Sequence, residues 1–395
     1  MLRFEGTFTR PEPIPEAGIE AAVSVMREGR LHRYGPFAGM AAALERAYAD
    51  WQGAGFCVAV ASGGQAMQIG LRALGVRPGD RVLANAWTLA PVPGAIASVG
   101  AEPVLVETTE DLVIDLDDLA AKARASDARV LLLSHMRGHL ADMDALMAWA
   151  GEAGVAVVED CAHSMGARWA GRRSGSHGRV ACFSTQSYKH MDSGEGGLLT
   201  TDDPEIAARA TILSGSYMNH ARHGAGPEPG AFADARLDCP NGSARMDELR
   251  AAVLLPQIEA LEDRVARWAE RHDAVAAALA EAPGVALPAA PGRAERVGSS
   301  IQFRLPDLSA DGCRGFVADA AARGVDLKWF GAPEPHGFTS AYGSWRYVRA
   351  QSLPRTDAVL AALFDMRLPL TFTPQDCRLI GAILAGCAAA TRATA

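Results

Sequence analysis

Residues 183–197 read Phe183-Ser184-Thr185-Gln186-Ser187-Tyr188-Lys189-His190-Met191-Asp192-Ser193-Gly194-Glu195-Gly196-Gly197, a turn rich in serine and glycine that holds one lysine. An apolar run upstream, Val155-Ala156-Val157-Val158-Glu159-Asp160, ends on a carboxylate. Continuous apolar runs of this length are typical of strands that are buried on both faces of a parallel sheet. Because ligands bind beyond the carboxyl ends of such strands, Asp160, Ser184 and Lys189 are candidates for one site.

Short apolar runs alternate with helical patterns through the first two-thirds of the chain. The runs that predict strands are Val58–Val60, Arg81–Ala84, Glu102–Val106, Val130–Leu133, Val155–Val158, Val180–Phe183 and Gly197–Thr200. Segments between them, such as Gln65–Ala73 and Asp144–Ala153, have helical spacing. We therefore expect an α/β fold in which helices cover a mainly parallel seven-stranded sheet.

The composition of the chain changes after this region. Asp247–Leu287 is rich in alanine, leucine, glutamate and arginine and predicts long helices. Two clusters of proline and glycine, Pro283-Gly284 and Pro288–Gly292, then open a smaller α+β domain in which Ser299–Leu305 is the clearest strand. We predict a large α/β domain with an N-terminal arm over residues 1–250, and connecting helices with a small C-terminal domain over residues 251–395.

Composition narrows the class of protein. The chain has 395 residues, 49% of them hydrophobic, a formal net charge of -8 and no long basic run, which argues against a nucleic-acid partner. No stretch approaches the roughly 18 apolar residues of a membrane helix, so we expect no membrane association. The cysteines are odd in number (7) and lack Cys-x-x-Cys spacing, which argues against disulfide frameworks and zinc sites and predicts a reducing cytoplasm.

The lysine and the carboxylate suit one cofactor chemistry. A lysine amine can form a Schiff base with pyridoxal 5'-phosphate, and a carboxylate can keep the pyridine nitrogen protonated so that the ring accepts electrons. The phosphate of such a cofactor needs backbone N–H groups at a helix N-terminus and hydroxyl groups. Ser62-Gly63-Gly64-Gln65 at the start of a predicted helix offers the former, and Ser184 the latter. We therefore expect pyridoxal phosphate as cofactor and no metal.

A series of motifs in a fixed order resembles one enzyme family. The motifs are Tyr34-Gly35-Pro36, Leu44-Glu45-Arg46-Ala47-Tyr48, Ala59–Ala66, Pro78–Leu83, His135–His139 with Ala141–Asp144, Glu159-Asp160-Cys161-Ala162-His163, the Lys189 segment, Arg245–Leu249 and Leu368-Pro369-Leu370. From about residue 16 to about residue 390, the chain resembles the DegT/DnrJ/StrS aminotransferases, the sugar-aminotransferase branch of the fold-type I pyridoxal-phosphate enzymes. The resemblance implies the fold-type I architecture and a homodimer with shared active sites.

The same resemblance implies residue roles. Lys189 and Asp160 would be catalytic, and His163 would lie beside the phenolic oxygen of the cofactor. Three positions depart from the family pattern. Relatives carry Gly-Thr where this chain has Gly63-Gly64, which leaves the backbone amides or the side chain of Gln65 to bind the phosphate. The aromatic residue that stacks on the ring is replaced by Leu89, so Trp87 could stack or line the pocket instead. The asparagine that reaches the phosphate in the neighbouring subunit is replaced by Ser243, with Asn241 as a substitute.

The resemblance also implies an activity. We expect transfer of an amino group from a glutamate- or glutamine-like donor to a keto-sugar, cyclitol or other secondary-metabolite intermediate. Some relatives have histidine in place of Lys189 and are dehydratases, so the lysine favours transamination. A lyase, dehydratase, decarboxylase or aromatising enzyme on this fold, and a non-catalytic regulatory protein, remain alternatives. Arg137 has two readings, a ligand for a substrate anion or a partner in a structural ion pair.

Overall fold

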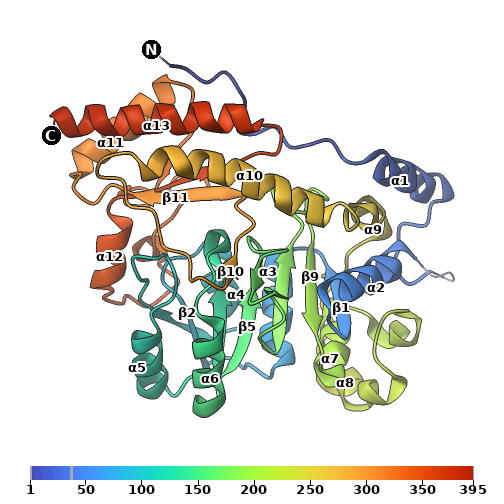
Figure 1. Cartoon of the computed structure of the whole chain (residues 1–395). Helices are drawn as coiled ribbons and strands as arrows, with labels where there is room; N and C mark the ends of the chain where they lie inside the picture. Colours follow the sequence, from blue (N-terminus) through green and yellow to red (C-terminus); the bar gives the residue numbers. More distant parts are fainter. Residues whose placement is uncertain (1, 36–38, 395) are drawn as a thin grey trace.

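The computed structural model describes residues 2–35 and 39–394, so Pro36 of the first motif lies outside the described residues. Its centre is a seven-stranded sheet (Figure 1). The order is β1-β9-β8-β5-β4-β2-β3, with β1 at Phe56–Val60, β2 at Arg81–Asn85, β3 at Glu102–Val106, β4 at Val130–Ser134, β5 at Ala156–Asp160, β8 at Val180–Ser184 and β9 at Gly197–Thr201. Strand β9 is antiparallel to both neighbours, and β8, β5, β4, β2 and β3 are parallel. The predicted mainly parallel sheet is confirmed.

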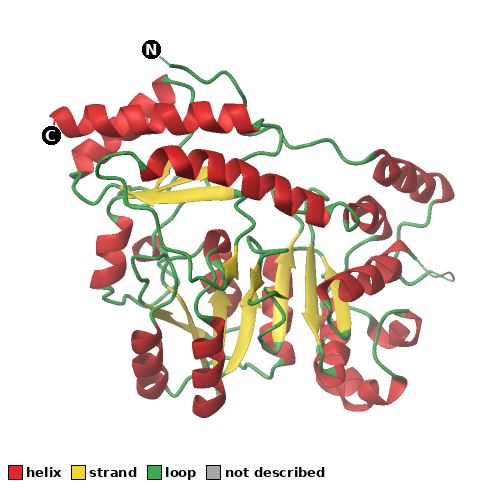
Figure 2. Ribbon diagram, viewed as in Figure 1, coloured by secondary structure: helices red, strands yellow, loops and turns green. Residues whose placement is uncertain are grey.

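Apolar side chains alternate between the two faces of this sheet. On β1, Val58 and Val60 pack into one cluster, whereas Cys57 and Ala59 pack into another. Helices α3 (Gly63–Ala73), α4 (Pro91–Ser98), α7 (Pro204–Ser214) and α8 (Phe232–Asp238) cover the first face. The opposite face packs against α2 (Met40–Gln52), α5 (Leu116–Ser126), α6 (Met143–Ala153), α9 (Glu248–Leu254) and α10 (Leu261–Ala280) (Figure 2). Because both faces are buried, the strands are apolar through most of their length, and polar residues such as Asn85, Ser134 and Asp160 lie at their carboxyl ends.

A second sheet lies above the central one and next to the site described below (Figure 1). It is antiparallel in the order β11-β13-β12, with β11 at Ser300–Arg304, β13 at Leu363–Arg367 and β12 at Lys328–Trp329. Its apolar residues pack against α10, α11 (Ala310–Ala322) and α13 (Pro374–Thr394). The strand that was predicted over Ser299–Leu305 is therefore present as β11.

The remaining elements connect these two parts. The helices are α1 (Glu16–Glu28) and α12 (Pro354–Leu360), and short 3-10 turns cover Met136–Gly138, Tyr217–Arg222, Pro229–Ala231, Leu255–Gln257 and Tyr342–Ser344. A small sheet pairs β10 (Ala294–Glu295) with β6 (Arg168–Trp169), which also pairs with β7 (Arg172–Arg173). The predicted domain boundary after residue 250 falls inside α9, and the division of the chain there stays a prediction.

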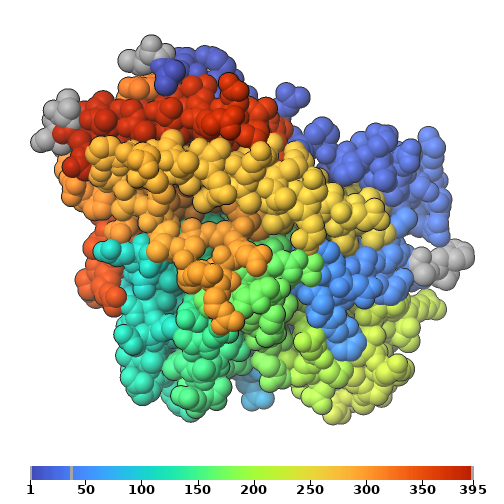
Figure 3. Space-filling view, in the orientation of Figure 1, coloured from blue at the N-terminus to red at the C-terminus, as the bar shows by residue number. Residues whose placement is uncertain are grey.

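The N-terminal arm packs beside the second sheet, which is formed by β11, β13 and β12. Phe4 and Phe8 are buried in the same cluster as residues of α13, and the space-filling view shows the N-terminal segment against that helix (Figure 3). All seven cysteines are buried and unpaired. Among the described residues, no helix is both long and apolar enough to cross a membrane.

Candidate active site

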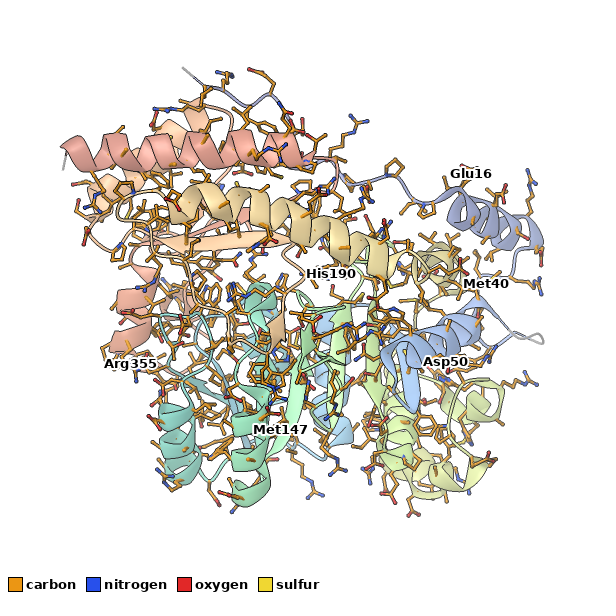
Figure 4. The ribbon with its side chains drawn as sticks, in the orientation of Figure 1. Glu16, Met40, Asp50, Met147, His190 and Arg355 are labelled. Atoms are coloured by element: carbon orange, nitrogen blue, oxygen red, sulfur yellow. The ribbon has the colours of Figure 1, made fainter. Side chains whose placement is uncertain are left out.

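Lys189 lies in the turn between β8 and β9 and faces the carboxyl end of β5. Its Nζ atom is 2.8 Å from Nε2 of His163, which lies three residues beyond the end of that strand. Tyr188 has a left-handed backbone with φ of 80°, which is unusual for a bulky residue and helps to turn the chain at this point. His190 lies between the central sheet and α10, and its ring packs edge-on against Trp268 of α10, with the ring centroids 5.0 Å apart (Figure 4). The turn is therefore anchored to α10 while the lysine amine points toward β5.

Burial and nearby cations change the basicity of both Lys189 and His163. Burial, followed by repulsion from Arg137, lowers the pKa of Lys189 to about 7. Burial, followed by repulsion from Lys189, lowers the pKa of His163 well below its usual value, so the imidazole is neutral. An Nη atom of Arg137 is 3.4 Å from the same Nε2 atom. A guanidinium only donates, so Nε2 of His163 acts as an acceptor toward it. Lys189 is thus a lysine whose amine is partly neutral near pH 7.

Asp160 is a buried carboxylate at the last position of β5. Its Oδ2 accepts a 2.9 Å hydrogen bond from Oγ of Ser134 on β4, and its Oδ1 accepts one of 3.1 Å from the backbone N–H of Ala162. Ser134 in turn accepts a 2.9 Å hydrogen bond from Oγ1 of Thr88. Burial raises the pKa of Asp160, and no basic side chain within the described part of the chain forms an ion pair with it. A buried carboxylate without a cation is costly, so this position suits a positively charged ligand group.

The turn from β1 into α3 meets the end of β8. Ser62 caps α3, and its Oγ accepts a 3.1 Å hydrogen bond from the backbone N–H of Gln65. A Cβ atom at Gly63 would lie 2.9 Å from Cβ of Ser184, and one at Gly197 would lie 2.4 Å from the backbone of Ser62. Glycine at both positions is therefore required for this close approach. The structure thus brings Gly63 against Ser184, and the binding of a phosphate by Gly63, Gly64, Gln65 and Ser184 stays a prediction.

A cavity of about 260 Å³ opens in front of Lys189 and His163. One side comes from the central sheet, with Leu89 and Arg137, and the other from the second sheet. The residues that line it are Phe8, Thr9, Leu89, Arg137, His163, Gln186, Tyr188, Lys189, Ser299, Ser300, Asp326, Lys328, Phe338 and Arg367. The lysine and the histidine therefore face a space that can hold a small molecule between the two sheets.

A sequence profile of the DegT/DnrJ/EryC1/StrS aminotransferase family matches residues 13–384. The chain belongs to this family. The dTDP-3-amino-3,4,6-trideoxy-alpha-D-glucose transaminase of Streptomyces venezuelae is 32% identical over 375 residues, which cover 93% of this chain and 91% of that protein. The L-glutamine:scyllo-inosose aminotransferase of Streptomyces griseus is 34% identical over 266 residues, which cover 66% of this chain and 61% of that protein.

Solved structures agree with the family assignment. DesV of S. venezuelae, in complex with a ketimine intermediate, superposes with a TM-score of 0.78 at 29% identity and covers 94% of both chains. The structure of 3-amino-5-hydroxybenzoic acid synthase has a TM-score of 0.83 at 25% identity and covers 97% of this chain and 99% of that chain. The predicted fold is confirmed, and the protein is an aminotransferase of the DegT/DnrJ/EryC1/StrS family.

In this aminotransferase, Trp87 and Leu89 occupy different environments. Trp87 is buried with 2% of its surface exposed, and its ring packs edge-on against Phe330 at 5.7 Å within a cluster that includes Met136. Leu89 lines the cavity, whereas Trp87 is absent from the residues that line it. The structure therefore places Leu89, and not Trp87, at the cavity, and a stacking role for Trp87 stays a prediction.

Asn241 is absent from the residues that line the cavity in front of Lys189. Its side chain is exposed, and its Oδ1 accepts a 2.7 Å hydrogen bond from the backbone N–H of Tyr217. Arg245, on the same segment, donates a 2.7 Å hydrogen bond to the carbonyl of Gly215. The predicted contact of Asn241 with the phosphate of a neighbouring subunit needs a second chain and stays a prediction.

Sequence reasoning missed Arg367 and Tyr188 as cavity residues. Arg367 ends β13 directly before the recognised motif Leu368-Pro369-Leu370, so its position was adjacent to a known signal. No pattern in the sequence connects residue 367 with residue 188. Their contact exists because the second sheet is placed over the turn that carries Lys189.

Proposed function

We propose that this aminotransferase uses pyridoxal 5'-phosphate and that Lys189, Asp160, His163, Ser184 and the Ser62–Gln65 turn hold it. The observation that carries the proposal is Asp160, a buried carboxylate whose hydrogen bonds come from Ser134 and Ala162 and not from a cation. A protonated pyridine nitrogen would supply the missing positive charge. The close turn at Gly63 and Ser184 has the amides and the hydroxyl that a phosphate requires.

The residues have separate tasks in this proposal. When bound, pyridoxal phosphate supplies a ring that withdraws electrons from the substrate α-carbon. Asp160 keeps a proton on the ring nitrogen, and Ser134 holds the carboxylate in place. The neutral Nζ of Lys189 takes the proton from the substrate α-carbon as a general base. Neutral His163 contacts Nζ and limits the directions in which the amine can move.

We further propose an amino acid such as glutamate or glutamine as the donor and a keto-sugar, cyclitol or related ketone as the acceptor. Relatives with the printed activities of a sugar transaminase and of an inosose aminotransferase support this substrate class. A lyase, decarboxylase or aromatising reaction would differ in its product. Incubation with a donor and a keto acceptor should therefore yield an aminated acceptor and the keto acid of the donor in equal amounts.

We also infer a homodimer in the cytoplasm. Tyr217, whose backbone N–H bonds Asn241, exposes 54% of its surface, and Met218 and Leu237 expose 63% and 74%. Exposed large apolar side chains favour a protein partner. Seven buried thiols without disulfides fit a reducing compartment. Light scattering after size-exclusion chromatography should give twice the monomer mass, and a monomer at micromolar concentration would contradict the inference.

The test of the cofactor site uses the small number of lysines in the chain. The chain has three lysines, Lys122, Lys189 and Lys328. Borohydride reduction of the holoenzyme should attach the cofactor to the Lys189 peptide, as detected by mass spectrometry. Lys328 lines the same cavity, so Lys328→Ala is a matched control that should still be labelled, whereas Lys189→Ala should not. Label on Lys328 or Lys122 would overturn the assignment.

A further inference from the structure

The second sheet turns a polar face toward the cavity. On β11 and β13, Ile301, Phe303, Phe364 and Met366 are buried in the apolar cluster against α10, α11 and α13. Alternate residues of a strand point to opposite faces, so Ser300, Gln302, Asp365 and Arg367 share the other face. Ser300 and Arg367 are register partners, and both line the cavity beside Lys189.

Most charges on this face are already paired. Asp365 is fully buried and accepts a 2.6 Å hydrogen bond from Arg137, which reaches it from the loop after β4. Its other oxygen accepts a 2.8 Å hydrogen bond from Gln302, and Nζ of Lys328 is 3.7 Å away. Asp365 thus contacts two cations, and a second carboxylate, Asp326, lines the cavity. Arg137, Lys328 and Arg367 together outnumber these two carboxylates, so the cavity has an excess of positive charge.

Arg367 is the exception. Within residues 2–35 and 39–394, no hydrogen bond or ion pair engages its guanidinium. Instead, its Cζ lies 3.9 Å from the centroid of the Tyr188 ring. Burial lowers the pKa of this arginine to about 10, yet the group stays charged at neutral pH. Stacking on an aromatic ring holds the planar group in one orientation while its N–H donors remain available.

We propose that Arg367 binds a carboxylate group of a substrate that enters the cavity in front of Lys189. A guanidinium binds a carboxylate through two parallel hydrogen bonds, and the excess of positive charge around it favours such an anion. Ser300, the register partner of Arg367, lines the cavity on the same side, so its hydroxyl is near this subsite. Arg137 is committed to Asp365, which leaves Arg367 as the binding group. The inference rests on the proposed function, because the carboxylate would belong to the amino donor or to the keto acceptor.

The test follows each half-reaction of the holoenzyme separately, in single turnovers, from the absorbance of the cofactor. The donor half uses L-glutamate and 2-oxoglutarate, and the acceptor half uses the keto acceptor that the wild-type enzyme aminates. Arg367→Ala should raise the apparent Kd of the carboxylate-bearing substrate by at least about 30-fold, as expected for the loss of a charged hydrogen-bonding partner, with little change in the limiting rate. Arg367→Lys should restore part of the affinity, because the charge returns without the planar fork.

A matched control is Arg304→Ala. Arg304 lies on the adjacent strand β11 and pairs with the exposed Glu110, so its removal should leave both halves unchanged. A binding measurement without turnover is provided by calorimetry with L-glutamate on Lys189→Ala protein that has been loaded with pyridoxal phosphate. If Arg367 binds the donor carboxylate, the double variant Lys189→Ala/Arg367→Ala should give no measurable heat at the concentrations at which Lys189→Ala binds L-glutamate.

The outcomes show whether the carboxylate belongs to the donor or to the acceptor, and they test the role of Arg367 separately from the proposed function. A weaker donor half with an unchanged acceptor half assigns the carboxylate to the donor, and the reverse result assigns it to the acceptor. Unchanged apparent Kd values in both halves, or an equal loss in both limiting rates, would overturn the role of Arg367. In either of those cases the wild-type enzyme still turns over, so the proposed function stands. Failure of borohydride labelling at Lys189 would instead remove the proposed function itself.

Discussion

Lys189 and Asp160 illustrate how burial, more than residue type, sets chemistry at single positions. Burial favours the neutral form of each group, so the pKa of the lysine falls and that of the carboxyl group rises. In a cavity with His163, two groups shifted in this way mark a functional site. A neutral lysine amine can react with a ligand carbonyl group, and a carboxyl group without a cation can pair with a positively charged ligand group.

Replacing Asp160 with asparagine tests the more deeply buried of the two groups. Asp160→Asn keeps the size of the side chain. Its one amide oxygen can accept the hydrogen bond from the N–H of Ala162, and its NH2 group can donate to Oγ of Ser134, so the protein should fold with a nearly unchanged Tm. The neutral amide cannot hold a proton on a ring nitrogen, and kcat should fall by at least about 100-fold. Steady-state rates and thermal melts of cofactor-loaded protein are the measurements. Near-normal turnover by the loaded variant would refute this role for Asp160.

Lys189 should also impose a pH dependence on cofactor capture by the apoprotein. The neutral amine is the nucleophile, and its pKa is about 7 in the folded protein against 10.5 for a free lysine. The capture rate should therefore rise with pH up to about 7 and become constant above it. Because the folded pKa is the lower one, Lys189 destabilises the fold fully below about pH 7, and this penalty fades as the pH rises toward 10.5. A stopped-flow profile that still rises steeply between pH 8 and 10 would contradict the shift.

Among the strands and turns, the ion pair of Arg137 with Asp365 joins β4 to β13. Arg137 has a left-handed backbone with φ of 56°, and Gly138 follows it with φ of 85°. This tight turn directs the guanidinium from the end of β4 to the second sheet, where both side chains are almost completely buried. The geometry therefore supports the structural reading of Arg137 that the sequence left open.

Breaking this pair should be costly. Arg137→Ala leaves the carboxylate of Asp365 buried and short of a partner, so the free energy of unfolding should fall by about 3 kcal/mol. Urea unfolding of apoprotein measures the change, and Arg129→Ala, which removes an exposed pair with Asp127, is a control that should alter it by less than about 1 kcal/mol. The double variant Arg137→Ala/Asp365→Asn should lose less stability than the sum of the losses in Arg137→Ala and Asp365→Asn. Additive losses would show that the two side chains do not interact.

The N-terminal arm ties the start of the chain to its C-terminal helix. Phe4, Phe8 and Phe372 form a cluster of rings in edge-to-face contact, with centroids between 4.9 and 5.8 Å apart. The arm continues to Thr9, and both Phe8 and Thr9 line the cavity. Phe8, which lines the cavity, is thus held by Phe372, a residue more than 350 positions away in the sequence. Such a contact contributes to stability and to the shape of the cavity together.

Phe8→Ala should test this link. The substitution leaves a cavity in the apolar cluster and should lower the free energy of unfolding by about 3 kcal/mol. Leu2→Ala serves as the control because Leu2 is 54% exposed, and it should leave stability nearly unchanged. The measurement is the Tm of apoprotein together with urea unfolding. Equal melting of Phe8→Ala and wild type would mean that the arm does not pack in solution as described.

Local patterns predicted much of the fold and of the cofactor site. The seven strands were recognisable because each is buried on both faces and is therefore mostly apolar. Asp160 and Ser184 end strands, and His163 and Lys189 follow them within a few residues. The shared edge of parallel strands brings such positions together. Their roles as cofactor ligands stay predictions. The environment of Trp87 was not predictable, because whether a tryptophan after a strand enters the core depends on Phe330, far along the chain.

The amino-acid sequence alone determined the class of fold, the order of its strands along the chain and the residue types at their ends. Those properties follow from periodicity and from short motifs, which need no knowledge of distant neighbours. Only the tertiary structure decided that Arg137 pairs with Asp365 and that Arg367 stacks on Tyr188 without an ion pair to any other described residue. Which arginine has a partner depends on how the second sheet docks on the turn of Lys189, and docking is a property of packing between segments that no local pattern contains.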